Sequence, residues 1–120
     1  MANPFVHVEL STDNVGKAKE FYGQLFNWTL EDMPMPGGTY TMIRVGEGTG
    51  GGMMKNPEAG TPSAWLPYVQ VDDIDASTKK AKSLGAEVCV DVMEVEGAGW
   101  LSVITDPTGA KLGMWKPKPM

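Results

Sequence analysis

Residues 65–84 read WLPYVQVDDIDASTKKAKSL, and residues 6–25 read VHVELSTDNVGKAKEFYGQL. Both stretches open with a run that includes alternating apolar residues, pass through a short polar segment containing Asp, and continue with apolar residues spaced three and four apart. Alternation predicts a strand, and the wider spacing predicts an amphipathic helix. A displacement of 59 residues aligns the stretches and carries Leu10 onto Val69, Asp13 onto Asp72, Val15 onto Ile74 and Leu25 onto Leu84. The chain is therefore interpreted as an internal repeat.

The first copy predicts one helix among four strands. Thr12, Asp13 and Asn14 suit the start of a helix. Its apolar face is expected to pack on the sheet and consists of Val15, Ala18, Phe21, Tyr22, Leu25 and Phe26. Strands are expected at Phe5 to Leu10, near Trp28 to Leu30, at Tyr40 to Val45, and around Met53 and Met54. The glycine-rich segment 46–52 is interpreted as a flexible hairpin loop.

The second copy repeats this order. It predicts a helix at Ile74 to Leu84 and strands at Trp65 to Val71, Glu87 to Val92, Trp100 to Thr105 and Lys111 to Trp115. Each half is thus a βαβββ module, and a unit of roughly 55 residues leaves much of its sheet exposed. We expect an α+β fold in which the two tandem modules form one curved mixed sheet around a central pocket. The expected organisation is a single domain over 1–120, with modules at about 4–56 and 64–117 joined by a connector at about 57–63.

Composition restricts the partners and the cellular location. The 120 residues carry a formal net charge of -5 and no clustered run of Lys and Arg, which argues against nucleic acid. No apolar stretch approaches the roughly 20 residues that cross a bilayer, so no membrane span is expected. The start of the chain lacks the pattern of an export signal, which predicts a cytoplasmic protein. Cys89 lies between Val88 and Val90 and is expected to be a buried, inert thiol.

Four segments in this order resemble the vicinal oxygen chelate superfamily, which includes glyoxalase I, bleomycin-resistance proteins and ring-cleaving dioxygenases. The segments are His7 to Leu10, Ala18 to Trp28, Tyr68 to Asp73, and Asp106 to Leu112. The resemblance spans nearly the whole chain and implies the glyoxalase/bleomycin-resistance fold.

Metal-using members of this superfamily hold one divalent ion with four ligands, commonly His and Glu, one from the first and one from the last strand of each half. Carried over position by position, the resemblance places the first ligand on His7 and the second on Met53 or Met54. It places the third on Leu66 and the fourth on Gly113. Since Zn, Ni or Mn needs three or more nitrogen, oxygen or thiolate donors, we predict no metal site and no cofactor.

Alternation assigns the side chains that face the expected pocket. His7 and Glu9 share one side of their strand, whereas Val6, Val8 and Leu10 take the helix side. An imidazole beside a carboxylate can exchange protons, so these two residues are candidate catalytic groups. The alternative is a histidine that is merely hydrogen-bonded within a polar pocket or that lies in a dimer interface. The candidate ligand-binding residues are Tyr40, Met42, Arg44, Met54, Leu66, Tyr68, Gln70, Trp100 and Trp115.

Three functions remain open at this point. The first is metal-free binding of a small organic molecule, in the manner of the bleomycin-resistance proteins. The second is a lyase or isomerase of the glyoxalase type, acting on a small metabolite with His7 and Glu9 as proton-transfer groups. The third is a role in assembly, since relatives often pair as dimers and a homodimer is expected here.

Overall fold

The computed structural model describes residues 3–35, 37–57 and 60–119 and shows two compact units. The first unit comprises His7–Leu66, and the second comprises Pro67–Met120 together with Met1–Val6. The backbone contacts explain this division, because the amide nitrogen of Gln70 donates to the carbonyl oxygen of Pro4 at 2.9 Å. Pro4 is thereby tied to the second unit, a detail that the sequence pattern did not indicate.

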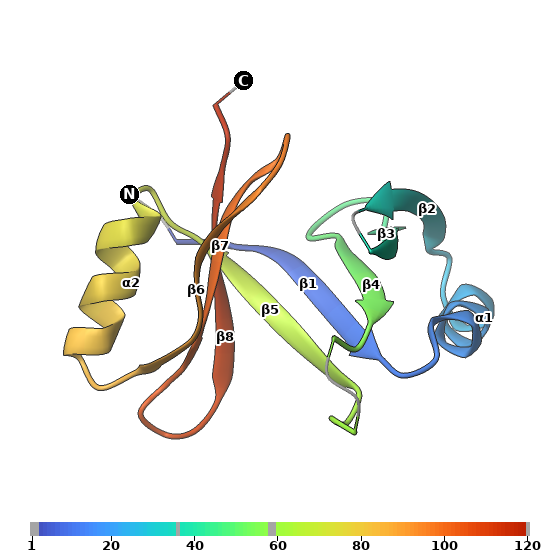
Figure 1. The fold of residues 1–120 in the computed structure, drawn as a ribbon. Coiled ribbons are helices and arrows are strands. Elements are labelled where there is room, and N and C mark those ends of the chain that lie inside the picture. The colour runs from blue at the N-terminus through green and yellow to red at the C-terminus, as the bar shows by residue number, and fades with distance from the viewer. Residues whose placement is uncertain (1–2, 36, 58–59, 120) are drawn as a thin grey trace. The chain divides into compact units, whose positions relative to one another are not determined.

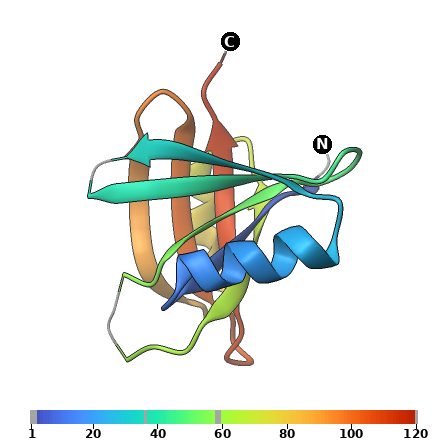
Figure 2. The same cartoon turned by 90° about the vertical axis from the view of Figure 1, so that its right-hand side faces the viewer.

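The first unit contains β1 (Phe5–Thr12), α1 (Val15–Leu25), β2 (Thr29–Met35), β3 (Gly38–Arg44) and β4 (Gly51–Lys55), the first two residues of β1 being assigned to the second unit. Its strands lie in the order β2-β3-β4-β1. β1 pairs with β4 in parallel, and the other pairs are antiparallel. Helix α1 contacts β2 and β4, and Figure 2 shows this helix, in blue, nearest the viewer.

The second unit contains β5 (Ala64–Gln70), α2 (Ile74–Ser83), β6 (Glu87–Val95), β7 (Gly99–Thr105) and β8 (Lys111–Pro117), the first three residues of β5 being assigned to the first unit. The strand order is β5-β8-β7-β6, with β5 and β8 parallel and the others antiparallel. Helix α2 contacts β6, β7 and β8 (Figure 1). Both units therefore have the same βαβββ topology, and the predicted α+β class is confirmed.

The helix starts repeat with the predicted displacement. Asn14 caps α1 by accepting from the amide nitrogen of Lys17 at 3.0 Å, and Asp73 caps α2 by accepting from that of Ala76 at 3.0 Å. These caps satisfy amide groups that have no partner inside the helix. None of the helices formed by the described residues is long and apolar enough to cross a membrane.

Each unit packs its own core between its helix and its sheet. In the first unit the buried residues are Leu10, Ile43 and Met53, and in the second they are Val71, Ile74, Ala86, Ile104 and Met114. A buried hydroxyl accompanies each core. Thr41 donates to Asp32 at 2.8 Å, and Thr78 lies 2.9 Å from Ser102. These bonds satisfy polar groups that would be costly to bury unpaired.

Two expectations about burial are wrong. Val15, Ala18 and Tyr22 pack against the core, but Phe21, Leu25 and Phe26 are exposed, because the predicted apolar stripe of α1 is wider than the surface that the sheet covers. Cys89 is also exposed. It lies in β6, which pairs on one side only, and its Sγ contacts Thr105 Oγ1 at 2.9 Å.

Candidate functional site

The sheet of the first unit has a helix face and an opposite face, and alternation assigns them correctly. Leu10 and Ile43 belong to the core against α1, and Val45 packs on it. The side chains between these positions point the other way, which brings His7 and Glu9 of β1 to the same face as Tyr40 of β3. All three are half-buried.

Tyr40 connects the two candidate catalytic residues. Its Oη lies 2.6 Å from Nε2 of His7 and donates to Oε1 of Glu9 at 3.0 Å. Both distances are within hydrogen-bond range, so the imidazole, the phenol and the carboxyl group form one continuous chain. The sequence predicted His7, Glu9 and Tyr40 separately but did not predict that the hydroxyl joins the other two.

Gly52 provides the space that this arrangement needs. A Cβ atom at Gly52 would lie 2.1 Å from Tyr40 Oη and 2.2 Å from its Cε2 and Cζ, distances at which the ring would have to move. The backbone at Gly52 does not have a positive φ, so the absence of a side chain serves the ring rather than the backbone. The expected loop over residues 46–52 is corrected here, because Gly51 and Gly52 are buried residues of β4.

The strand registers correct one ligand position. Gly52 lies opposite Glu9 in the first unit, just as Gly113 lies opposite Tyr68 in the second. The counterpart of Gly113 is therefore Gly52 and not Met53 or Met54. Met53 lies on the helix side with no exposed surface. A signal for this alignment was present in the sequence, since Gly-Met-Met-Lys at 52–55 recurs as Gly-Met-Trp-Lys at 113–116.

The second unit also places a tyrosine ring over its glycine. A Cβ atom at Gly113 would lie 2.3 Å from Cδ2 of Tyr68, whose side chain is buried with 4% of its surface exposed. Trp115 shares this face, because Met114 and Leu112 belong to the core on the α2 side. Gln70 lies opposite Trp115, and Leu66 is half-buried two residues before Tyr68.

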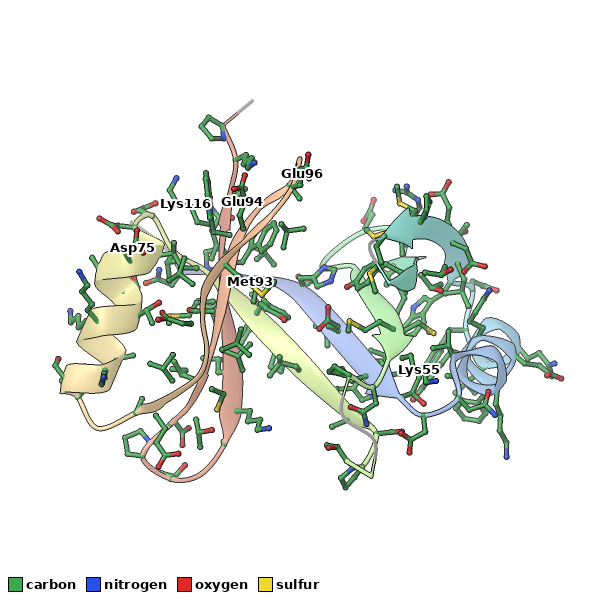
Figure 3. The ribbon with its side chains drawn as sticks, viewed as in Figure 1. Lys55, Asp75, Met93, Glu94, Glu96 and Lys116 are labelled. Carbon is green, nitrogen blue, oxygen red and sulfur yellow. The ribbon has the colours of Figure 1, made fainter. Side chains whose placement is uncertain are left out.

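The remaining candidates lie in different surroundings. Met42 pairs with Gly52, so it shares the face of Tyr40, and Met54 follows two residues after Gly52 on that face. Arg44 is exposed and forms an ion pair with Glu31 at 2.7 Å. Trp100 packs against the core on the α2 side, near Lys116 and Lys118. Figure 3 shows Lys116 at the same end of this unit as Glu94.

The four ligand positions do not fit a divalent metal ion. They hold His7, Gly52, Leu66 and Gly113, and tyrosine rings lie where side chains at the two glycines would extend. Over residues 3–35, 37–57 and 60–119, no group of three His, Cys, Asp or Glu side chains could hold a metal. One imidazole supplies too few donors for Zn, Ni or Mn.

Electrostatics favour a neutral imidazole in this site. Burial lowers the pKa of His7 below its ordinary value of 6.5, since the charged form loses hydration. At neutral pH the ring therefore has one nitrogen with a proton and one without, which is the state that can accept a proton.

Comparison with known proteins identifies the family. The model of the Glyoxalase/Bleomycin resistance protein/Dioxygenase superfamily matches residues 5–114, and the chain belongs to this superfamily. The predicted resemblance to the vicinal oxygen chelate group is thereby confirmed.

Curated relatives are similar in sequence, and two of them represent the two kinds of name. "Putative glyoxylase CFP32" of Mycobacterium bovis is 40% identical over 114 residues, which cover 91% of this chain and 44% of that protein. The anthracycline biosynthesis protein DnrV of Streptomyces peucetius is 30% identical over 123 residues, covering 90% of this chain and 45% of DnrV. The chain thus spans less than half the length of these relatives.

Solved structures share the fold. One is a methylmalonyl-CoA epimerase of Streptomyces coelicolor in complex with 2-nitronate-propionyl-CoA, with a TM-score of 0.76 at 11% identity. The superposition covers 99% of this chain and 100% of the epimerase chain. A methylmalonyl-CoA epimerase of Mycobacterium tuberculosis has a TM-score of 0.73 at 16% identity, with 96% of this chain and 88% of that one covered. At these identities the likeness concerns the fold alone.

Proposed function

We propose that this superfamily member binds a small organic molecule on the face of the first unit that carries His7, Tyr40 and Glu9, without the divalent metal ion of metal-using relatives. The observation that carries the proposal is the hydrogen-bonded chain from His7 through Tyr40 to Glu9. It places polar groups at one point of a face that also holds Met42 and Met54. A few fixed polar groups beside thioether and aromatic surface suit an organic ligand with an apolar body.

The names of the similar proteins suggest two classes of small molecule with which binding can be tested. An anthracycline tests the kind of compound named with DnrV, and methylmalonyl-CoA tests the kind named with the epimerases. The chain contains one histidine, so nuclear magnetic resonance can follow its ring signals without ambiguity during titration. Binding at this face shifts the His7 signals in a saturable way, and Tyr40→Phe weakens the binding. If neither probe moves the His7 signals at any concentration, these two ligand classes are excluded.

Metal independence has a separate test. A ligand that binds the folded state alone raises the melting temperature by mass action. Adding Zn, Ni or Mn to protein treated with a chelator is expected to leave the melting temperature unchanged. A rise with one metal that His7→Ala abolishes would contradict the metal-free proposal.

A second candidate function is proton transfer, which the neutral state of His7 favours. Here His7 accepts a proton from a small metabolite, and Glu9 stabilises the charged ring through Tyr40. An acidic hydrogen next to a carbonyl group is the simplest target. Methylmalonyl-CoA incubated in heavy water is expected to exchange that hydrogen faster with the wild-type protein than with His7→Ala. Equal rates would eliminate this reaction and leave ligand binding in place.

We also propose that the chain pairs with a second copy through α1. Support comes from the exposed residues Phe21, Leu25 and Phe26, beside which Tyr22, Trp28 and Trp65 stack in one aromatic cluster. A contiguous apolar surface of this kind is typical of protein interfaces. Sedimentation should show a dimer that Phe21→Ser with Phe26→Ser dissociates. Met93→Ser, at an exposed apolar position labelled in Figure 3, serves as the control and should leave the dimer intact.

The location of the chain in the cytoplasm stays a prediction, as does its organisation as a single domain. The first is tested by fractionation of cells that express the chain, and the second by whether residues 7–66 fold when expressed alone.

A further inference from the structure

The hydroxyl group of Tyr40 has one proton and lies within hydrogen-bond distance of both Glu9 and His7. Its Oη lies 3.0 Å from Oε1 of Glu9 and 2.6 Å from Nε2 of His7. The hydroxyl group donates to Oε1 of Glu9, so its single proton is directed towards that oxygen. The contact with His7 then needs a proton on Nε2, which donates to a lone pair of Tyr40 Oη.

We propose that Tyr40, seated on Gly52, is a positioning residue that holds His7 in the tautomer with its proton on Nε2 and thereby makes Nδ1 the proton acceptor of the site. The two nitrogens of a neutral imidazole differ in role, and the hydrogen bond of one decides the role of the other. The use of Nδ1 as a base rests on the proton-transfer function proposed above. The tautomer itself does not depend on it.

Gly52 makes this arrangement possible. The Tyr40 ring lies so close to the Gly52 backbone that a methyl group there would overlap its Oη, Cε2 and Cζ. The Tyr40 ring occupies the space that a side chain at Gly52 would need. From this position its hydroxyl group reaches both His7 and Glu9 of β1. Since Gly52 has no positive φ, the chain conformation at this point does not itself require glycine. The residue is therefore part of the positioning device.

A purely structural role for Tyr40 is the competing explanation, in which its ring only fills the space above a glycine. Tyr68 provides the comparison, because its ring also lies over a glycine, Gly113, but approaches it with Cγ, Cδ2 and Cε2 rather than with the hydroxyl end. The two explanations differ in what the Tyr40 hydroxyl does. Filling space needs only the ring, whereas setting the tautomer needs the oxygen and its proton. Tyr40→Phe keeps the ring and removes only the hydroxyl, so it separates them.

The test is a nuclear magnetic resonance spectrum of the ring nitrogens of His7, the one histidine in the sequence. Untagged protein labelled with ¹⁵N is measured without ligand or metal at about one unit above the ordinary histidine pKa of about 6.5. In the wild type, Nε2 is expected to carry the proton, and this proton exchanges slowly with water. In Tyr40→Phe the exchange is expected to be at least about tenfold faster, because the acceptor is gone. Tyr22→Phe, which removes a tyrosine hydroxyl from the helix side of the same unit, is the control and should leave both properties unchanged.

Glu9→Ala provides a second, independent test of the His7 tautomer. Without the carboxylate, the Tyr40 hydroxyl proton can turn towards Nε2, so the population with the proton on Nδ1 is expected to rise. The proposal is overturned if the wild type carries its proton on Nδ1, or if Tyr40→Phe and Glu9→Ala both leave the spectrum unchanged. Because the measurement needs no ligand, failure to bind either probe would count against the proposed function and leave the tautomer result standing.

Discussion

The two units cover the same glycine position with a tyrosine ring, but they take that tyrosine from different strands. Tyr40 of β3 lies over Gly52 in the first unit, and Tyr68 of β5 lies over Gly113 in the second. By register, Leu101 occupies the place of Tyr40 in the second unit, and Glu9 occupies the place of Tyr68 in the first. The result is a polar chain in one unit and a buried ring in the other.

On the helix side of the sheets, by contrast, the two units carry similar residues at corresponding positions. Thr41 and Ser102 are both completely buried, Ile43 corresponds to Ile104, and Met53 corresponds to Met114. A core must fill a fixed volume between helix and sheet, so the two copies use similar side chains there. The opposite face has no such restriction in its choice of residues. The comparison therefore teaches that the repeat specifies the fold and that the chemistry lies where the repeat breaks.

Truncating the core methionines should have the largest effect on stability. Met53→Ala and Met114→Ala each remove a buried side chain and leave a cavity, which destabilises by about 2–5 kcal/mol. Met53 has no exposed surface and Met114 has 7%, so Met53→Ala is expected to cost more. Urea denaturation of both variants gives the two free energies. A cost below about 1 kcal/mol for both would show that neither methionine is packed in a core as described here.

Gly52→Ala and Gly113→Ala should affect different properties, the first the ring signals of His7 and the second mainly the stability. Either substitution pushes a ring, and overpacking typically costs about 1–3 kcal/mol. Tyr68 is buried and has little room to move, whereas Tyr40 is half-buried, so Gly113→Ala is expected to destabilise more than Gly52→Ala. Gly52→Ala should nevertheless be the variant that moves the His7 ring signals. If Gly113→Ala moves the His7 signals and Gly52→Ala does not, the assignment of the polar chain to the first unit is wrong.

Much of this comparison could be predicted from the sequence. The periods of two and 3.6 are local, so they placed the strands, the helices and the face shared by His7 and Glu9. The bond between His7 and Tyr40 joins residues 33 positions apart and depends on how β1, β4 and β3 pair. Register of that kind cannot be read from alternation alone. The repeat of Gly-Met-Met-Lys as Gly-Met-Trp-Lys would have identified Gly52.

The exposure of several apolar residues could not be predicted from the sequence pattern. The pattern of α1 shows which residues are apolar but not how much of that face the sheet covers, so the exposure of Phe21 and Leu25 was missed. Cys89 has apolar neighbours in sequence, yet its strand lies at the end of the strand order, where side chains are less enclosed. Both depend on tertiary arrangement rather than on local pattern.

Acid should destabilise the protein through His7 in a defined pH window. The folded-state pKa of His7 is lowered by burial, so the unfolded chain binds more protons as the pH falls below about 6.5. Stability therefore decreases from that pH down to the lower folded pKa and levels off below it. In His7→Gln this slope should disappear, because the chain has no other histidine. Denaturation at a series of pH values measures it, and an unchanged slope would mean that other groups cause it.

The smallest effect is expected at two ion pairs, one in each unit. Arg44 pairs with Glu31 at 2.7 Å with both side chains exposed, and exposed pairs contribute about 0–1 kcal/mol. Lys118 pairs with Glu94 and also lies over the ring of Trp100, so its aliphatic stem and charge both have partners. Lys118→Ala should therefore destabilise more than Arg44→Ala, whose cost should be close to zero.

A low cost for separating Arg44 from Glu31 has a consequence for binding. An arginine that its partner holds weakly can turn to an anionic ligand at little expense, and Arg44 lies on the strand face of Tyr40 and Met42. Arg44→Ala is therefore expected to leave the free energy of unfolding nearly unchanged and to weaken binding of methylmalonyl-CoA, with little change for an uncharged probe. Lys118→Ala is the matched control, since it removes one positive charge from the other unit. If both variants weaken binding equally, the effect comes from net charge alone, and Arg44 loses its place among the ligand-binding residues.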